Sequence, residues 1–321
     1  MESEYFKNKI VAVTGASGFL GTNYIKKLIE RGAKVKASQH IRKVKIEHNN
    51  LEIVENIDLM NIQDCMKFVE GAEIVIHSGG NIAHPSTVPT DIQISLQNIN
   101  TISNVIDACN RTGVKRFLDL NSSTGYADKR YAVAEDEFWD EEPFHAYYGY
   151  GWMRRYREKL LEHVSRFSKT EIFIGRGTAI FGPFDNFDTK TCHVVPALIN
   201  RVLQNENPFY VWGSPDVVRD FLYVEDVVNA ALLILEKGEP MRPYNVGSGQ
   251  AITVGQIVES ILKATQKKPK VIWDNSKPTT IPFRMVSTKR ITEELNFVPK
   301  YTFDEGIEKT VNWYKENYLN K

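Results

Sequence analysis

The chain has 321 residues, and its 40 Lys and Arg residues are balanced by 40 Asp and Glu residues, so the formal net charge is zero. This balance argues against a general nucleic-acid-binding protein, which usually has a basic excess. No apolar run is long enough to cross a membrane and the first ten residues lack the apolar core of a signal peptide, so we expect a cytoplasmic protein.

Short apolar runs alternate with helical patterns through the first half of the chain. Strands are expected at 10–14, 33–38, 51–54, 74–77, 117–120 and 172–174, with helices from the first strand to about 31, at 92–110 and at 150–167. Such alternation indicates right-handed βαβ units and a parallel sheet with helices on both faces. The predicted fold class is α/β, with a Rossmann-type doubly wound parallel sheet.

The pattern changes after about residue 180, where loops lengthen and prolines become frequent. Helices are still expected at 194–204 and 224–235, and two more begin at Thr253 and Thr302. Gln256 and Glu305 stand three residues after these threonines and complete capping boxes. We therefore predict a larger domain over 1–178 and a smaller α/β domain over 179–321, with some crossing of the chain. A cleft between two domains is the default place for a substrate.

Three glycines follow the first strand directly and open the first helix. Gly15 permits a tight turn, Gly18 lets a pyrophosphate approach the backbone, and Gly21 lets helix and strand pack closely. The exposed N–H groups and the helix dipole favour anionic phosphates at this place. The turn therefore predicts a dinucleotide site formed by Gly15, Ser17, Gly18, Phe19, Leu20 and Gly21.

The Gly-x-x-Gly-x-x-Gly spacing at this turn resembles that of the extended short-chain dehydrogenase/reductase family, which comprises nucleotide-sugar epimerases, dehydratases and reductases. The resemblance covers nearly the whole chain and implies a nicotinamide dinucleotide cofactor and a nucleotide-diphosphate sugar as substrate. It implies a homodimer as well, formed through the helix that bears the catalytic tyrosine. Further cofactor contacts implied by the resemblance are Asp58, Leu59, Ser78, Gly79, Gly80 and Asn98.

The end of the second strand bears on the choice of cofactor. In this family an acidic residue there binds the ribose hydroxyls of NAD. Residues 36–43 contain no acid, and Arg42 and Lys43 follow the strand. A cation suits a 2′-phosphate, so we expect NADP, with Arg42 as a ligand. The alternative is NAD, with residues 42–43 as an ordinary solvated loop.

The family's chemistry uses a Ser or Thr, a Tyr, and a Lys four residues after the Tyr. The resemblance places Ser122 and Tyr150 in the first two roles, with Arg154 in place of the Lys. Tyr150 and Arg154 would share a helix face and also contact the nicotinamide ribose. A nearby cation lowers the pKa of a tyrosine from about 10, which proton transfer near neutrality requires. Arg keeps the charge but is planar and does not release its proton.

The second half resembles that of GDP-fucose synthases and their relatives. The resemblance implies that Arg219 grips the diphosphate and that His193 is an acid/base residue, with Thr124 standing where the partner cysteine would be. Thr124 is a poor replacement for a thiol, which disfavours a double epimerisation. Dehydration is disfavoured because Ser123 and Thr124 replace an Asp-Glu pair. The implied substrate contacts are Asn186, His193, Val194, Trp212, Arg219 and Arg284.

Three functions compete on this sequence. The first is a 4-keto reductase of a nucleotide sugar, with hydride from NADPH and Tyr150 as the acid. The second is a 4-epimerase that retains NAD through a transient ketone. The third is a non-catalytic dinucleotide-binding protein, suggested by Arg154 and by Ala179, which replaces a substrate-binding Asn of the family. No metal site is predicted, because Cys65, Cys109 and Cys192 are scattered without metal-like spacing.

Overall fold

The computed structural model describes residues 3–80, 92–188, 191–276 and 281–319, and its centre is a parallel sheet of seven strands. The strand order is β12-β7-β5-β4-β1-β2-β3, and every neighbouring pair is parallel. The predicted α/β class is confirmed. The strands are β1 (Ile10–Thr14), β2 (Lys34–Ser38), β3 (Leu51–Val54), β4 (Ile74–His77), β5 (Arg116–Ser122), β7 (Glu171–Gly177) and β12 (Tyr244–Val246).

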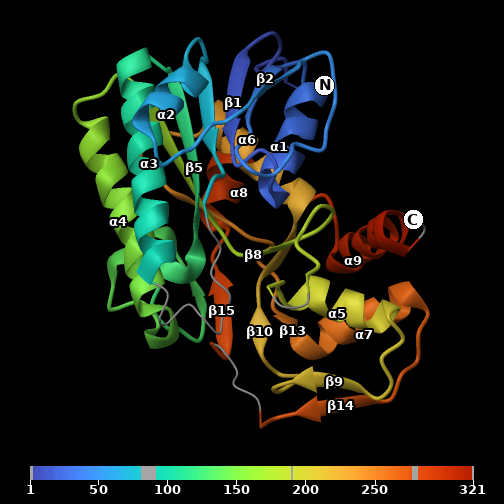
Figure 1. The fold of residues 1–321 in the computed structure, drawn as a ribbon. Helices are drawn as coiled ribbons and strands as arrows, with labels where there is room; N and C mark the ends of the chain where they lie inside the picture. Colours follow the sequence, from blue (N-terminus) through green and yellow to red (C-terminus); the bar gives the residue numbers. More distant parts are fainter. Residues whose placement is uncertain (1–2, 81–91, 189–190, 277–280, 320–321) are drawn as a thin grey trace.

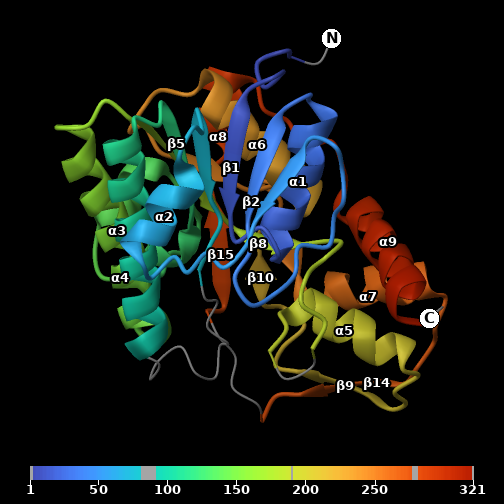
Figure 2. The same ribbon diagram turned by 45° about the horizontal axis from the view of Figure 1, so that its top comes forward.

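Helices cover both faces of this sheet (Figures 1 and 2). On one face α1 (Phe19–Glu30) packs against α6 (Val224–Lys237), and α8 (Lys289–Leu295) packs against α6 and β12. On the other face lie α2 (Ile62–Val69), α3 (Ile92–Thr112) and α4 (Tyr148–Ser165). Side chains of one strand alternate between the two cores: Val11 and Val13 join the α1 side, and Ala12 joins the α2–α3 side. Burial on both faces explains the continuous apolar runs of the strands.

Outside the large sheet, the second part of the chain has a separate hydrophobic core. Its helices are α5 (Val194–Leu203), α7 (Val254–Thr265) and α9 (Phe303–Tyr314). Both predicted capping boxes are present, at Thr253 with Gln256 and at Thr302 with Glu305. Among the described residues, no helix has the length and apolar character needed to span a bilayer. The small sheets contain β6 (Ala132–Val133), β8 (Ala179–Phe181), β9 (Phe209–Trp212), β10 (Val218–Arg219), β11 (Phe221–Tyr223), β13 (Ile252–Thr253), β14 (Val271–Asp274) and β15 (Phe283–Val286).

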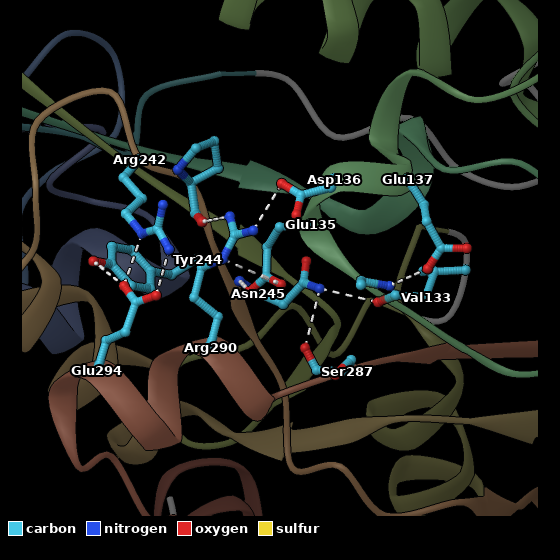
Figure 3. A network of polar contacts seen from close by, with 12 residues as sticks. Val133, Glu135, Asp136, Glu137, Arg242, Tyr244, Asn245, Ser287, Arg290 and Glu294 are labelled. Carbon is cyan, nitrogen blue, oxygen red and sulfur yellow. Dashed lines mark hydrogen bonds and ion pairs between the residues drawn. The ribbon is translucent and has the colours of Figure 1, made fainter.

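A polar network ties the edge strand β12 to the segments around β6 and β15 (Figure 3). The Asn245 side chain donates to the carbonyl oxygens of Val133 and Ser287, each at 3.1 Å. Its backbone N–H donates to the buried Glu135 carboxylate at 2.8 Å. Arg290, at the start of α8, donates to the Asp136 carboxylate at 2.7 Å. These contacts fix β15, which carries Arg284, relative to the large sheet.

Candidate active site

The glycine turn at the carboxyl edge of β1 has the geometry of a phosphate cradle. Gly15 has φ +61°, and a Cβ there would lie 2.6 Å from the carbonyl oxygen of Ser78. A Cβ on Gly21 would lie 2.2 Å from the carbonyl oxygen of Gly15. Gly15 is therefore required because its backbone is left-handed, and Gly21 is required because the helix approaches the turn closely there.

The first turn of α1 presents backbone donors at this cradle. Gly18 is the N-cap residue, no side chain caps the helix, and no acid lies in its first turn. Such an end binds an anion through its N–H groups and the helix dipole. The pyrophosphate of a dinucleotide fits this end of the helix: Ser17 precedes the N-cap residue, and Phe19 and Leu20 begin the helix.

A second turn, after β4, completes the same edge of the sheet. The Ser78 hydroxyl donates to the carbonyl of Thr14 at 2.6 Å, and the Gly79 N–H donates to the Thr14 hydroxyl at 3.0 Å. A Cβ on Gly79 would lie 2.7 Å from Leu59 Cδ1, and one on Gly80 would lie 2.6 Å from Asn98 Oδ1. The structure thus gathers the predicted cofactor residues Leu59, Ser78, Gly79, Gly80 and Asn98 beside Gly15, while Asp58 accepts from the Met60 N–H at 2.9 Å.

A carboxylate lies near the end of β2, although residues 36–43 of the sequence contain no acid. Gln39 accepts from the Val44 N–H at 2.8 Å and donates to Glu55 at 3.3 Å, which brings a carboxylate from the end of β3 to this place. Arg42 is exposed on the following loop. Inspection of β2 alone misses Glu55, because this residue follows the neighbouring strand β3.

Tyr150 and Arg154 form the contact that their spacing predicts. Arg154 Nη2 donates to the Tyr150 hydroxyl, and its guanidinium carbon lies 4.6 Å from the centre of the tyrosine ring. Tyr150 itself is buried, with 7 % of its surface exposed. A fixed positive charge therefore touches the hydroxyl that would exchange the proton.

The turn that carries Ser122 packs directly against the helix that carries Tyr150. Ser122 Oγ accepts from the Thr124 hydroxyl at 3.1 Å, at the start of η1 (Ser123–Gly125). A Cβ on Gly151 would lie 2.9 Å from the carbonyl of Thr124, so the first turn of α4 has no space between it and η1. Ser122, Thr124, Tyr150 and Arg154 therefore lie on adjoining elements.

A buried polar chain holds α4 in this place. Asn121 donates to the Arg154 carbonyl at 3.0 Å and to Glu158 at 2.8 Å. Glu158 accepts two further bonds from Arg176 of β7, at 2.9 and 2.6 Å. Arg176 also donates a hydrogen bond to the Tyr126 hydroxyl at 3.0 Å. Since both charges of the Glu158–Arg176 pair are satisfied by hydrogen bonds, this network holds α4 in a defined position relative to β5 and β7.

Arg219 and Arg284 are direct neighbours across two parallel strands, β10 and β15. Arg284 Nη1 donates to the carbonyls of Ser123 at 2.7 Å and Tyr126 at 3.1 Å, whereas its Nη2 has no partner in the described part of the chain. Burial, together with the Arg219 guanidinium, lowers the pKa of Arg284 to about 10. The Arg284 guanidinium is buried and that of Arg219 is partly buried, and an anion beside these two neighbouring cations would offset their repulsion, so this place suits a diphosphate.

Comparison with known proteins agrees with this geometry. The model of the NAD dependent epimerase/dehydratase family matches residues 11–247. The chain belongs to this family. The match includes the glycine turn, Ser122, Tyr150 and Arg219, and the chain is therefore an enzyme of the epimerase/dehydratase family that uses a nicotinamide dinucleotide.

Relatives in this family match the chain over nearly its whole length. It is 28% identical to GDP-L-fucose synthase 1 of Arabidopsis thaliana over 98% of this chain and 96% of the relative. It is 26% identical to a dTDP-4-dehydro-6-deoxy-D-allose reductase of a Streptomyces species, over 98% of this chain and 99% of the relative. Among solved structures, an epimerase of Methanothermobacter thermautotrophicus shares the fold, with a TM-score of 0.88, 22% identity, and coverage of 99% and 95% of the two chains.

The other predicted substrate residues of this family member lie in the second part of the chain. His193 is the N-cap residue of α5, Val194 begins that helix, and Trp212 ends β9 with 63 % of its surface exposed. Asn186 uses its side chain within its own loop, donating to Thr191 at 2.8 Å and accepting from the Asp188 N–H at 3.0 Å. Arg284 connects this part of the chain to the turn that follows Ser122, through its hydrogen bonds to the carbonyls of Ser123 and Tyr126.

Proposed function

We propose that this enzyme reduces the 4-keto group of a nucleotide-diphosphate sugar with hydride from NADPH. The observation that carries the proposal is the Arg154–Tyr150 hydrogen bond at a buried position beside the Ser122 turn. The names of two full-length relatives, a fucose synthase and a 4-dehydro-sugar reductase, support a reductase over other members of the family.

Each residue has a defined part in this chemistry. When bound, the dinucleotide supplies the hydride that adds to the carbonyl carbon. Tyr150 gives its hydroxyl proton to the carbonyl oxygen, and Arg154 stabilises the tyrosinate that results. Ser122 donates a hydrogen bond to the same oxygen. Arg219 and Arg284 hold the diphosphate and so place the sugar, and Asn186, His193, Val194 and Trp212 are proposed to line the rest of the substrate site.

The cofactor preference can be tested by the Arg42→Ala variant. We expect NADPH to bind more tightly than NADH to the wild type, and Arg42→Ala to weaken NADPH binding about tenfold, since a charged hydrogen bond to the 2′-phosphate is lost. NADH binding should change by less than twofold. Fluorescence titration of both nucleotides measures this, with the exposed Lys45→Ala as the control. Equal losses for both nucleotides, or no loss for either, would show that Arg42 does not recognise the 2′-phosphate.

A 4-epimerase that retains NAD is the second candidate, and Glu55 favours it. Its carboxylate accepts a hydrogen bond from Gln39 just after β2, and an acid at the end of that strand is the group that binds the ribose hydroxyls of NAD in this family. NAD released on denaturation of the purified protein, with no net oxidation or reduction of sugars, would support this candidate. Retained cofactor without turnover of any nucleotide sugar would support the non-catalytic alternative.

We also propose a homodimer through the outer faces of α3 and α4. Trp152 and Tyr156 stand one turn apart on α4, with 40 % and 52 % of their surfaces exposed, and Leu96 of α3 is 47 % exposed. Apolar side chains gathered on two packed helices are typical of a protein interface.

The cytoplasmic location stays a prediction.

A further inference from the structure

The side chain of Arg155 on α4 is buried and donates its hydrogen bonds to backbone carbonyls. Only 2 % of its surface is exposed. Its Nε donates to the carbonyl of Gly125 at 2.8 Å, its Nη1 to that of Glu141 at 2.6 Å, and its Nη2 to that of Asp140 at 3.1 Å. A buried charge is costly unless it is hydrogen-bonded, and the planar fork of a guanidinium can reach several carbonyls at once. A cation kept in such a place calls for a reason.

The three carbonyls belong to two segments that adjoin the helix of Tyr150. Gly125 is the last residue of η1 and so ends the serine turn, residues 122–125. Asp140 and Glu141 follow η2 (Glu135–Trp139), in the segment that leads into α4. Arg155 therefore joins the serine turn, this segment and α4 at one point.

The packing around these bonds leaves the serine turn little freedom. A Cβ on Gly125 would lie 2.3 Å from Phe138 Cζ, and a Cβ on Gly151 would lie 2.4 Å from Pro143 Cβ. Phe138 is fully buried, and the centre of its ring lies 5.9 Å from the Arg155 guanidinium carbon. Gly151 and Arg155 are four residues apart and so share a face of α4. That face holds the turn, which packs against Phe138.

The hydroxyl of Ser122 is tied to the same turn. Ser122 is the N-cap residue of η1, and its Oγ accepts from the Thr124 N–H at 3.3 Å and from the Thr124 hydroxyl at 3.1 Å. A serine hydroxyl has two lone pairs and one proton. Both lone pairs are used within the turn, which leaves the proton to be donated to the oxygen of a substrate. The position of the turn thus sets the position of this donor.

We infer that Arg155 is a positioning residue for the reaction: from the helix that carries Tyr150, it holds the Gly125 carbonyl and so keeps the Ser122 hydroxyl in place relative to Tyr150. The inference deepens the proposed reductase function and rests on it for the role of Ser122 as a donor to the sugar oxygen. Its structural content, that Arg155 fixes the serine turn, holds for the protein without substrate.

Kinetics of a double-mutant cycle test whether Arg155 acts through Ser122. Arg155→Met removes the three hydrogen bonds and should lower kcat for a 4-keto nucleotide sugar about tenfold, with NADPH affinity within about twofold of wild type. Ser122→Ala should lower kcat about 100-fold. In the Ser122→Ala background, Arg155→Met should lower kcat by less than about twofold further. The control is Arg166→Met, which removes an exposed guanidinium from the end of the same helix and should leave kcat unchanged.

Amide hydrogen exchange measures the serine turn without a substrate. The Thr124 N–H is bonded to Ser122 Oγ, and the Tyr126 N–H is bonded to the Ser123 carbonyl at 3.1 Å. In Arg155→Met, exchange in a peptide that spans residues 122–126 should be about tenfold faster than in the wild type. Exchange in α2 should be the same in both proteins.

Unchanged exchange of this peptide in folded Arg155→Met overturns the inference, whether or not the protein reduces a sugar. Faster exchange with an unchanged kcat overturns it as well, and so does a tenfold loss of kcat that persists in the Ser122→Ala background. If Arg155→Met does not fold, Arg155→Lys replaces it, since Lys keeps the charge and loses the planar fork. Faster exchange and a lower kcat then support the inference, and wild-type values overturn it. Faster exchange in the variant of a protein that reduces no nucleotide sugar would refute the reductase proposal alone.

Discussion

Tyr150→Phe should lower kcat about a thousandfold and leave NADPH affinity within about threefold of wild type. The variant removes the hydroxyl that receives the Arg154 hydrogen bond and keeps the buried ring. Loss of the positioned proton donor raises the barrier by about 4 kcal/mol, whereas the pyrophosphate contacts at the glycine turn are untouched. Steady-state kinetics with a 4-keto nucleotide sugar and a fluorescence titration of NADPH measure the two quantities.

Tyr148→Phe is the matched control for this variant. Tyr148 lies on the same helix, but 52 % of its surface is exposed. The same chemical change there should leave kcat within about twofold of wild type. A Tyr150→Phe enzyme that retains wild-type kcat would show that another group donates the proton.

Gly21→Ala should weaken dinucleotide binding by at least about 100-fold, or about 2.7 kcal/mol. The added Cβ would lie 2.2 Å from the Gly15 carbonyl oxygen, which is backbone and cannot yield without moving the turn. Displacement of the turn takes the N–H groups of α1 away from the pyrophosphate. Titration with NADPH measures the affinity, and circular dichroism checks that the variant is folded.

The control here is Gly149→Ala, because a Cβ on Gly149 meets no atom within 4 Å. This variant should bind NADPH as the wild type does. Unimpaired binding by a folded Gly21→Ala protein would mean that the cofactor does not use this turn.

Local patterns were sufficient to predict the strands and helices around the carboxyl edge of the sheet, where the glycine turn lies. The run of apolar residues before Gly15 predicts β1, and the capping boxes at Thr253 and Thr302 predict the starts of α7 and α9, all of which are present. The short helices α2 and α8 were not predicted, since seven or eight residues show little periodicity. The place of β12 at the sheet edge was also missed, because a three-residue strand takes its position from tertiary pairing.

The site shows the same division between local and tertiary information. The i, i+4 spacing of Tyr150 and Arg154 predicts their contact, which the structure contains. The pairing of Arg219 with Arg284 joins strands 65 residues apart and depends on register, which the sequence does not encode locally. The buried ion pair between Asp119 of β5 and Arg157 likewise becomes evident only when α4 packs on the sheet.

Transfer of deuterium from NADPH labelled at carbon 4 of the nicotinamide tests the central claim most directly. The enzyme is incubated with each of the two stereospecifically deuterated forms and a 4-keto-6-deoxy nucleotide sugar, and the product is analysed by mass spectrometry. We predict that one form, and not the other, places a single deuterium on carbon 4 of the sugar while NADPH is consumed. Sugar recovered without deuterium from both forms, with NADPH unconsumed, would contradict the assignment of a nucleotide-sugar reductase.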